Sequence, residues 1–110
     1  MLLSLLALSI QAASSPLMAQ ADQLNGQFVT CLFGRARQAR AGSESAERFA
    51  SELETACRPE EMALRSAMLR VLSQRGLAKT ARAKVDDVMH RSRQAVVVAY
   101  ARTSSQTQWR

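Results

Sequence analysis

Residues that interrupt helices are scarce in this chain of 110 residues, which has four glycines and two prolines. Between them, apolar residues recur at helical spacing, and no sustained alternation of apolar and polar residues occurs. The pattern of a β-sheet protein is therefore missing. The run 95–101 contains three consecutive valines, but it keeps the helical phase of Val85 and Met89. We predict an all-α protein, a small up-down bundle of about four helices.

Motifs of familiar enzyme chemistry are also missing. The chain has one histidine and lacks the glycine-rich nucleotide-binding loops, the H-E-x-x-H motif and the G-x-S-x-G motif. The one group that resembles a site is Asp86, Asp87 and His90, where a carboxylate precedes an imidazole by four residues on one helical face. The same spacing is typical of a surface pair, and no nucleophile is identified. We predict a non-enzymatic protein without cofactor or metal, and keep an enzyme or metal site around Asp86 and His90 as a third hypothesis.

No apolar segment has the roughly 20 residues needed to cross a bilayer. The apolar stretch 2–10 is followed by small and polar residues and by Ala19-Gln20-Ala21, a small-x-small sequence. This pattern is typical of a signal peptide over residues 1–21, and it predicts a mature chain that begins at Asp22 and is periplasmic or secreted. Because no Lys or Arg precedes the apolar stretch, a misassigned start or a retained leader is the alternative.

Cysteine is limited to Cys31 and Cys57, which lie symmetrically about residue 44 in the turn-forming stretch 42–45. In two antiparallel helices, facing Cα atoms approach to roughly 4 to 5.5 Å, and a disulfide spans about 4.4 to 6.8 Å. The chain lacks the C-x-x-C spacing of redox and metal sites. We predict a disulfide that staples the first helical hairpin, with Gly34 and nearby alanines allowing close packing.

Local signals predict where the four helices begin and end. The first runs over 22–41 and ends at Gly42, and the second begins at an N-cap serine, Ser43 or Ser45. Pro59 is suited to the first turn of the third helix, and Gly76 to its end. The fourth follows directly, so that 22–102 form a single helical domain and 103–110 a flexible tail.

The charges are unevenly distributed. The chain has 15 Lys and Arg against 9 Asp and Glu, a formal net charge of +6. Four acids precede a base by four residues, the favourable helical orientation: Glu44 and Arg48, Glu54 and Arg58, Glu61 and Arg65, and Asp87 and Arg91. No acid lies between Asp22 and Glu44, or between Glu61 and Asp86. Apart from Arg65, which the spacing pairs with Glu61, the cations in these two stretches are Arg35, Arg37, Arg40, Arg70, Arg75, Lys79, Arg82 and Lys84.

In an up-down bundle, the first and third turns lie at the same end. We therefore predict that these eight cations gather at one basic pole and bind a partner. The alternative is that they complement helix dipoles. The leading hypothesis is an interaction module for an acidic protein or an anionic envelope surface, and the second is a membrane-surface-binding cationic helical protein that uses the stripe 96–100. Nucleic acid is not expected, because no aromatic residues stand among the cations.

Overall fold

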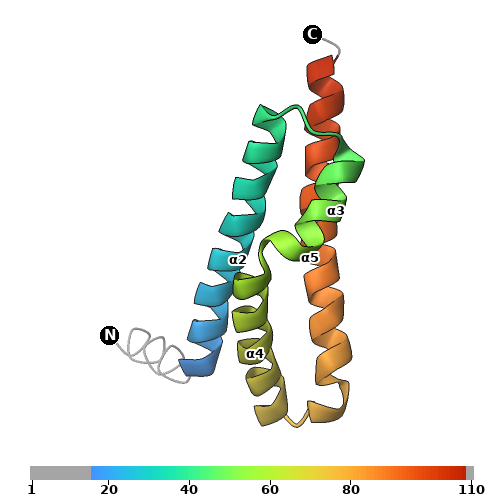
Figure 1. The fold of residues 1–110 in the computed structure, drawn as a ribbon. Coiled ribbons are helices and arrows are strands. Elements are labelled where there is room, and N and C mark those ends of the chain that lie inside the picture. Colours follow the sequence, from blue (N-terminus) through green and yellow to red (C-terminus); the bar gives the residue numbers. More distant parts are fainter. Residues whose placement is uncertain (1–15, 109–110) are drawn as a thin grey trace, which may run out of the picture.

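The structure is a computed structural model that describes residues 16–108, shown in Figure 1. Its elements are the helices α2 (Pro16–Ala41), α3 (Ala46–Ala56), α4 (Arg58–Gln74) and α5 (Ala78–Gln108). The described part of the chain contains no strand, and the valine-rich run 95–101 lies within α5. The predicted all-α class with four helices is confirmed.

The four helices form three antiparallel rows (Figure 1). α2 forms the first row, α3 and α4 follow one another along the second, and α5 runs the full length of the third. α2 and α5 each contact both helices of the middle row. A single residue, Cys57, separates α3 from α4, and the chain bends there without reversing direction.

The helix ends follow the local signals closely. Ser45 caps α3, because its side chain accepts a hydrogen bond from the backbone N–H of Arg48. Pro59 lies in the first turn of α4. α4 ends in a Schellman motif, with Gly76 at φ 76° and a hydrogen bond of 2.9 Å from the N–H of Leu77 to the carbonyl of Leu72.

The end of α2 differs from the prediction at one residue. Ser43, not Gly42, adopts the left-handed conformation, with φ 55°. The N–H of Glu44 donates to the carbonyl of Ala39, so this is the same motif with serine in the place that glycine usually occupies. The helix itself ends at Ala41, as predicted, and the left-handed residue follows one position later than expected.

Two helix bounds differ from the predicted domain limits. α2 begins at Pro16 rather than Asp22, and proline at a first helical position loses no hydrogen bond. α5 continues to Gln108, into the stretch 103–110 that we expected to be a tail. The apolar stretch 2–10 of the predicted leader and residues 109–110 lie outside the described residues.

The core runs along the centre of the three rows. Its largest fully buried side chains include Phe28, Leu32, Phe49, Leu64 and Tyr100, so every helix contributes to one cluster. Met62 of α4 is not part of this core, since it is 52% exposed. That side chain lies on the outer face of α4, two residues from the buried Leu64.

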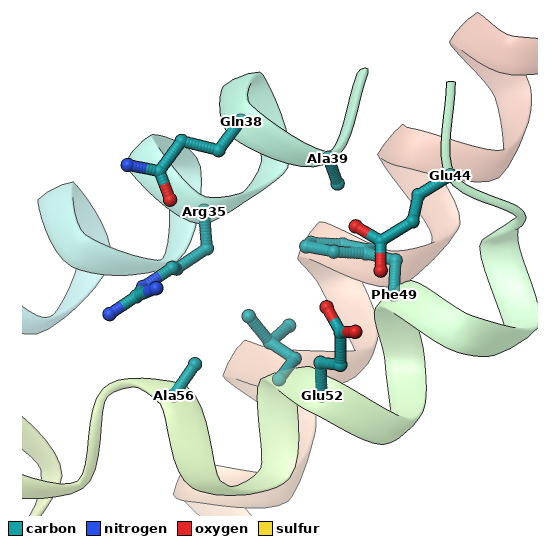
Figure 2. Close-up of a pocket in the computed structure, with 8 residues that line it drawn as sticks. Arg35, Gln38, Ala39, Glu44, Phe49, Glu52 and Ala56 are labelled. Carbon is teal, nitrogen blue, oxygen red and sulfur yellow. The ribbon is translucent and has the colours of Figure 1, made fainter. Parts of the chain in front are cut away.

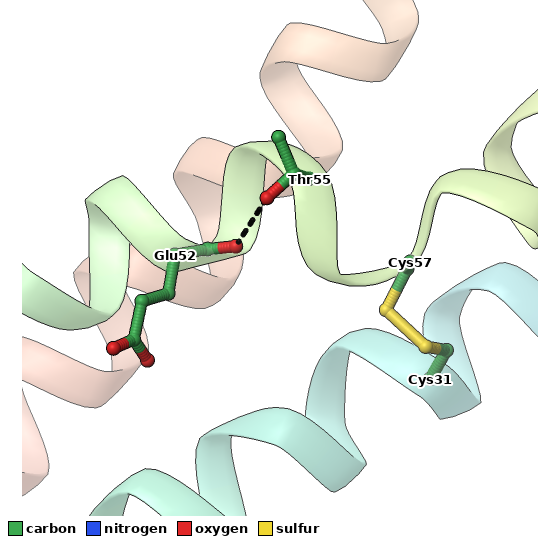
Figure 3. Close-up of a disulfide and its surroundings, with 4 residues drawn as sticks. All are labelled: Cys31, Glu52, Thr55 and Cys57. Carbon is green, nitrogen blue, oxygen red and sulfur yellow. Dashed lines mark hydrogen bonds between the residues drawn. A yellow bond between two sulfur atoms is a disulfide. The ribbon is translucent and has the colours of Figure 1, made fainter.

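Cys31 and Cys57 form the predicted disulfide, with their Cα atoms 6.1 Å apart (Figure 3). Cys31 lies within α2, whereas Cys57 occupies the bend between α3 and α4, so the link fixes the middle row to the first at its joint. The expected packing role of Gly34 is wrong. A Cβ atom there would meet no heavy atom within 4 Å, so the close approach at the disulfide does not depend on a glycine at this position.

Candidate functional site

The eight cations predicted to share one pole lie at two opposite ends of the molecule. The α2–α3 turn and the α4–α5 turn are at opposite ends (Figure 1), because α3 and α4 run in the same direction. Contacts of the basic side chains agree: Arg40 donates to the Thr103 hydroxyl of α5, and Arg75 contacts Met18 of α2. The prediction of a single basic pole is therefore wrong.

Arg35, Arg37 and Arg40 lie toward the C-terminal end of α2. Arg40 has local partners, since its guanidinium carbon also lies 6.0 Å from the centroid of the Tyr100 ring. Glu44 and Glu52 stand close to Arg35 in the cleft between α2 and α3. This end therefore carries side chains of both charge signs, which is typical of groups that stabilise the fold.

The other five cations surround the α4–α5 turn, and we call them the cationic end: Arg70, Arg75, Lys79, Arg82 and Lys84. All five are exposed, and no ion pair found among the described residues involves them. No acid occurs from residue 62 to residue 85. At the tip of the turn, the apolar side chain of Leu77 is 40% exposed between Gly76 and Ala78. The cationic end is therefore a cluster of exposed cations without ion-pair partners among the described residues.

Several other bases are neutralised, in part by partners that the sequence did not indicate. Glu44 and Arg48 lie 3.3 Å apart, and Asp87 and Arg91 lie 3.0 Å apart, as their spacing predicts.

The prediction for Glu61 and Arg65 is wrong, because both form ion pairs across the α4–α5 interface instead. Glu61 binds Arg93, and Arg65 binds Asp86. Such pairs depend on helix packing rather than on spacing within one helix.

Beside the cationic end lies a groove of about 350 Å³, the apolar groove, formed by α2, α4 and one residue of α5. Its lining residues are Met18, Ala21, Asp22, Asn25, Leu64, Met68, Val71, Leu72, Arg75 and Val88. Arg75 stands at one end, where its Nη2 lies 3.6 Å from the Met18 sulfur. The groove thus joins an apolar wall to a guanidinium.

A second cleft, of about 320 Å³, lies between α2 and α3 (Figure 2). The carboxyl groups of Glu44 and Glu52 extend toward each other beside the ring of Phe49, and Arg35 and Gln38 lie on the α2 side. The Nε of Arg48 lies 3.3 Å from Glu44 and 3.2 Å from Glu52.

The two carboxyls of this cleft influence each other's protonation. A hydrogen bond with Glu52 raises the pKa of Glu44, because it favours the protonated form. The same bond lowers the pKa of Glu52, with Arg48 adding to the effect. Glu44 is therefore the weaker acid of the pair and Glu52 the stronger one.

His90 lines a third cleft, of about 390 Å³, at the bend between α3 and α4. Glu54, Arg58 and the Glu61–Arg93 pair share this cleft. Asp86 is not among the lining residues, and its carboxylate is bound by Arg65. Within the described residues, no group of three or more His, Cys, Asp or Glu side chains is arranged to hold a metal ion.

The two ends of the apolar stripe 96–100 that the membrane-surface hypothesis used belong to the core. Val96 and Tyr100 are buried, and the ring centroids of Tyr100 and Phe49 lie 4.4 Å apart, whereas Val98 is 46% exposed. Within the described residues, no helix combines the length and the apolar character that a membrane span requires.

Comparison with known proteins gives no assignment: no protein family, no curated protein and no solved structure matches the chain.

The sequence analysis did not predict the apolar groove or the α4–α5 ion pairs. A signal for the groove was present, since residues 64, 68, 71, 72 and 75 lie on one face of a helix.

Proposed function

We propose that this chain is a non-enzymatic binding module that presents the cationic end to an anionic partner. The observation that carries the proposal is the set of five exposed cations around the α4–α5 turn, in a stretch without acids. Helix-dipole complementarity explains Arg75 at the C-cap of α4, but Lys79 lies in the first turn of α5, where positive charge is unfavourable. Because the helix dipole does not account for Lys79, its charge favours a role in binding.

The proposal that the protein is not an enzyme rests on the partners of its candidate groups. The Asp86 carboxylate is neutralised by Arg65, and Glu44 and Glu52 both pair with the guanidinium of Arg48. An export route remains part of the proposal. It is supported by the signal-peptide pattern over residues 1–21 and by a disulfide of the kind that persists in oxidising compartments.

Binding to heparin, used as a polyanion probe, tests the proposal. The triple variant Lys79→Gln, Arg82→Gln and Lys84→Gln should elute from a heparin column at clearly lower salt than the unmodified protein. The matched control is Arg35→Gln, Arg37→Gln and Arg40→Gln, which changes the net charge equally at the other end. Circular dichroism checks that both variants remain helical.

The two triple variants separate local binding from a general charge effect. Cations close to an anionic surface contribute about 1 kcal/mol each, so the α4–α5 variant should bind roughly 100-fold more weakly. The α2 control should lose much less. Equal losses in both variants would mean that binding follows net charge alone, and the assignment of the cationic end would fall.

A membrane surface is a second candidate partner, favoured by Leu77. An exposed apolar residue at the tip of a turn, flanked by Arg75 and Lys79, is suited to enter the headgroup region of an anionic bilayer. In liposome flotation, Leu77→Asn should reduce binding to anionic vesicles. Val98→Asn is the matched control, because Val98 is 46% exposed at a distance from the turn. No flotation with either anionic or neutral vesicles would remove this candidate.

A further inference from the structure

The apolar groove has a direction, because α2 and α4 run antiparallel along it. Met18 and Arg75 lie together at the end near the α4–α5 turn, and Asn25 and Leu64 lie toward the middle of the molecule. Leu64 and Arg75 are eleven residues apart on one helix, which at 1.5 Å per residue makes the groove about 16 Å long. The end near the α4–α5 turn carries the positive charge of Arg75, and the buried Leu64 lies at the inner end.

The lining is suited to a flexible hydrocarbon. Met18, Met68 and Leu72 are partly exposed within it, and methionine adapts its shape to irregular apolar ligands. Asp22 is the one acid among the lining residues, and it is exposed to water, where its charge is screened. Arg75 has the Met18 sulfur as a neighbour, which is a weak acceptor that leaves most of its donors for a ligand.

The size of the groove decides between occupants. At about 350 Å³ it lies near the lower limit of small-molecule pockets. A helix of a partner protein is about 10 Å across and would not enter it. A single unbranched alkyl chain is narrow enough, and the guanidinium at the end matches a carboxylate.

We infer that the apolar groove binds one aliphatic carboxylate, a fatty-acid anion, with its carboxylate at Arg75 and its chain directed toward Leu64. This goes beyond the proposed function, although both use the charge of Arg75. It applies to a chain that retains residues 16–21, because cleavage after Ala21 would remove the lining residues Met18 and Ala21. Binding involves no covalent step. The bound alkyl chain would cover Met68 and Leu72, which are otherwise partly exposed to water.

The methionines provide a direct test by NMR. The protein is labelled with ¹³C at the methionine methyl groups and titrated with decanoate below its micelle concentration. Met18 and Met68 line the groove, whereas the exposed Met62 and the buried Met89 do not line it and serve as internal controls. The inference expects saturable shifts of the Met18 and Met68 signals, with Met62 and Met89 unchanged. Equal shifts of Met62, or no shift at any methionine, would overturn it.

Two variants test the charge. Arg75→Gln should weaken decanoate binding about 10-fold, because a charge-assisted pair is lost. Arg70→Gln is the matched control, since Arg70 lies on the same helix outside the groove. Decanamide, which has the same chain without charge, should bind the unmodified protein about as weakly as decanoate binds Arg75→Gln. Equal affinity of decanoate for both variants would overturn the inference.

Decanoate binding to the groove can be tested separately from heparin binding to the cationic end. The triple variant at Lys79, Arg82 and Lys84 keeps every lining residue, so it should still bind decanoate with nearly unchanged affinity. Decanoate binding without heparin binding would remove the proposed function and leave the groove assignment. If an acidic peptide shifts the Met68 signal and decanoate does not, the groove serves a protein partner and the inference is overturned.

Discussion

The hydroxyl of Tyr100 donates a hydrogen bond to the backbone carbonyl of Glu44, 56 residues earlier in the chain. This contact joins α5 to the turn between α2 and α3. The Tyr100 ring is buried against Phe49, so the hydrogen bond is shielded from water. The contact fixes the end of the bundle that lies opposite the cationic end.

Tyr100→Phe keeps the ring packing and removes this hydrogen bond alone. We expect the free energy of unfolding to fall by about 1 kcal/mol, because the Glu44 carbonyl loses its donor. Urea denaturation measures the change. Tyr100→Leu, which also alters the packing against Phe49, should cost more. A Tyr100→Phe variant as stable as the unmodified protein would show that the bond contributes nothing in solution.

The disulfide should account for a large share of the stability. Cys31 and Cys57 are 26 residues apart, and closing a loop of that size stabilises a fold by about 3.5 kcal/mol in the chain-entropy description. The double variant Cys31→Ala and Cys57→Ala should therefore melt more than about 10 °C below the oxidised protein. The unmodified protein with a reductant is the control and should behave similarly. A melting temperature that does not respond to reductant would contradict the prediction.

Two turn residues at positive φ should respond in opposite directions. Gly76→Ala places a side chain at φ 76° and should cost about 1 to 2 kcal/mol. Ser43→Gly removes a side chain from φ 55° and should stabilise the fold, by up to about 1 kcal/mol. Thermal unfolding of both variants gives the comparison. Destabilisation by Ser43→Gly would mean that the serine makes a contact worth more than the relieved strain.

The Glu44–Glu52 pair predicts a pH dependence with a definite sign. Because the pKa of Glu44 is raised in the folded state, its contribution to stability is complete at low pH and is lost as the pH rises through that pKa. The lowered pKa of Glu52 acts in the opposite sense, and its contribution is lost as the pH falls. Glu44→Gln removes the first effect. The variant should gain stability relative to the unmodified protein as the pH rises above the usual glutamate value of about 4.3.

Carboxyl ¹³C NMR titration checks the same pair directly. Glu44 should titrate at higher pH than Glu52 in the unmodified protein. In Glu52→Gln, the hydrogen bond between two carboxyls is gone, and the pKa of Glu44 should move back toward its ordinary value. A Glu44 midpoint that stays where it was would show that burial rather than Glu52 causes the shift.

Local features of the fold were predictable from the sequence because short-range signals determine them. Ser45 at the start of α3, Gly76 after α4 and the spacing of the two cysteines were each sufficient. The direction of the chain at Pro59 was not predictable from the sequence. Proline indicates a new helix but carries no information on the angle to the preceding one, and a single intervening residue is too short for the loop of an antiparallel helix pair.

That one bend also explains what was missed in the candidate site. It places the α2–α3 turn and the α4–α5 turn at opposite ends of the molecule, so a set of cations inferred from spacing forms two clusters of different character. The pairs Arg65–Asp86 and Arg93–Glu61 depend on how α4 lies against α5. No pattern within a single helix reports such packing.

The joint at Cys57 has a consequence for how the molecule matures. With two cysteines in the chain, oxidation within one molecule has a single product, so no shuffling of incorrect pairings is required. An oxidant alone completes the structure. The competing product is a covalent pair of chains, and slow dilution during refolding should suppress it.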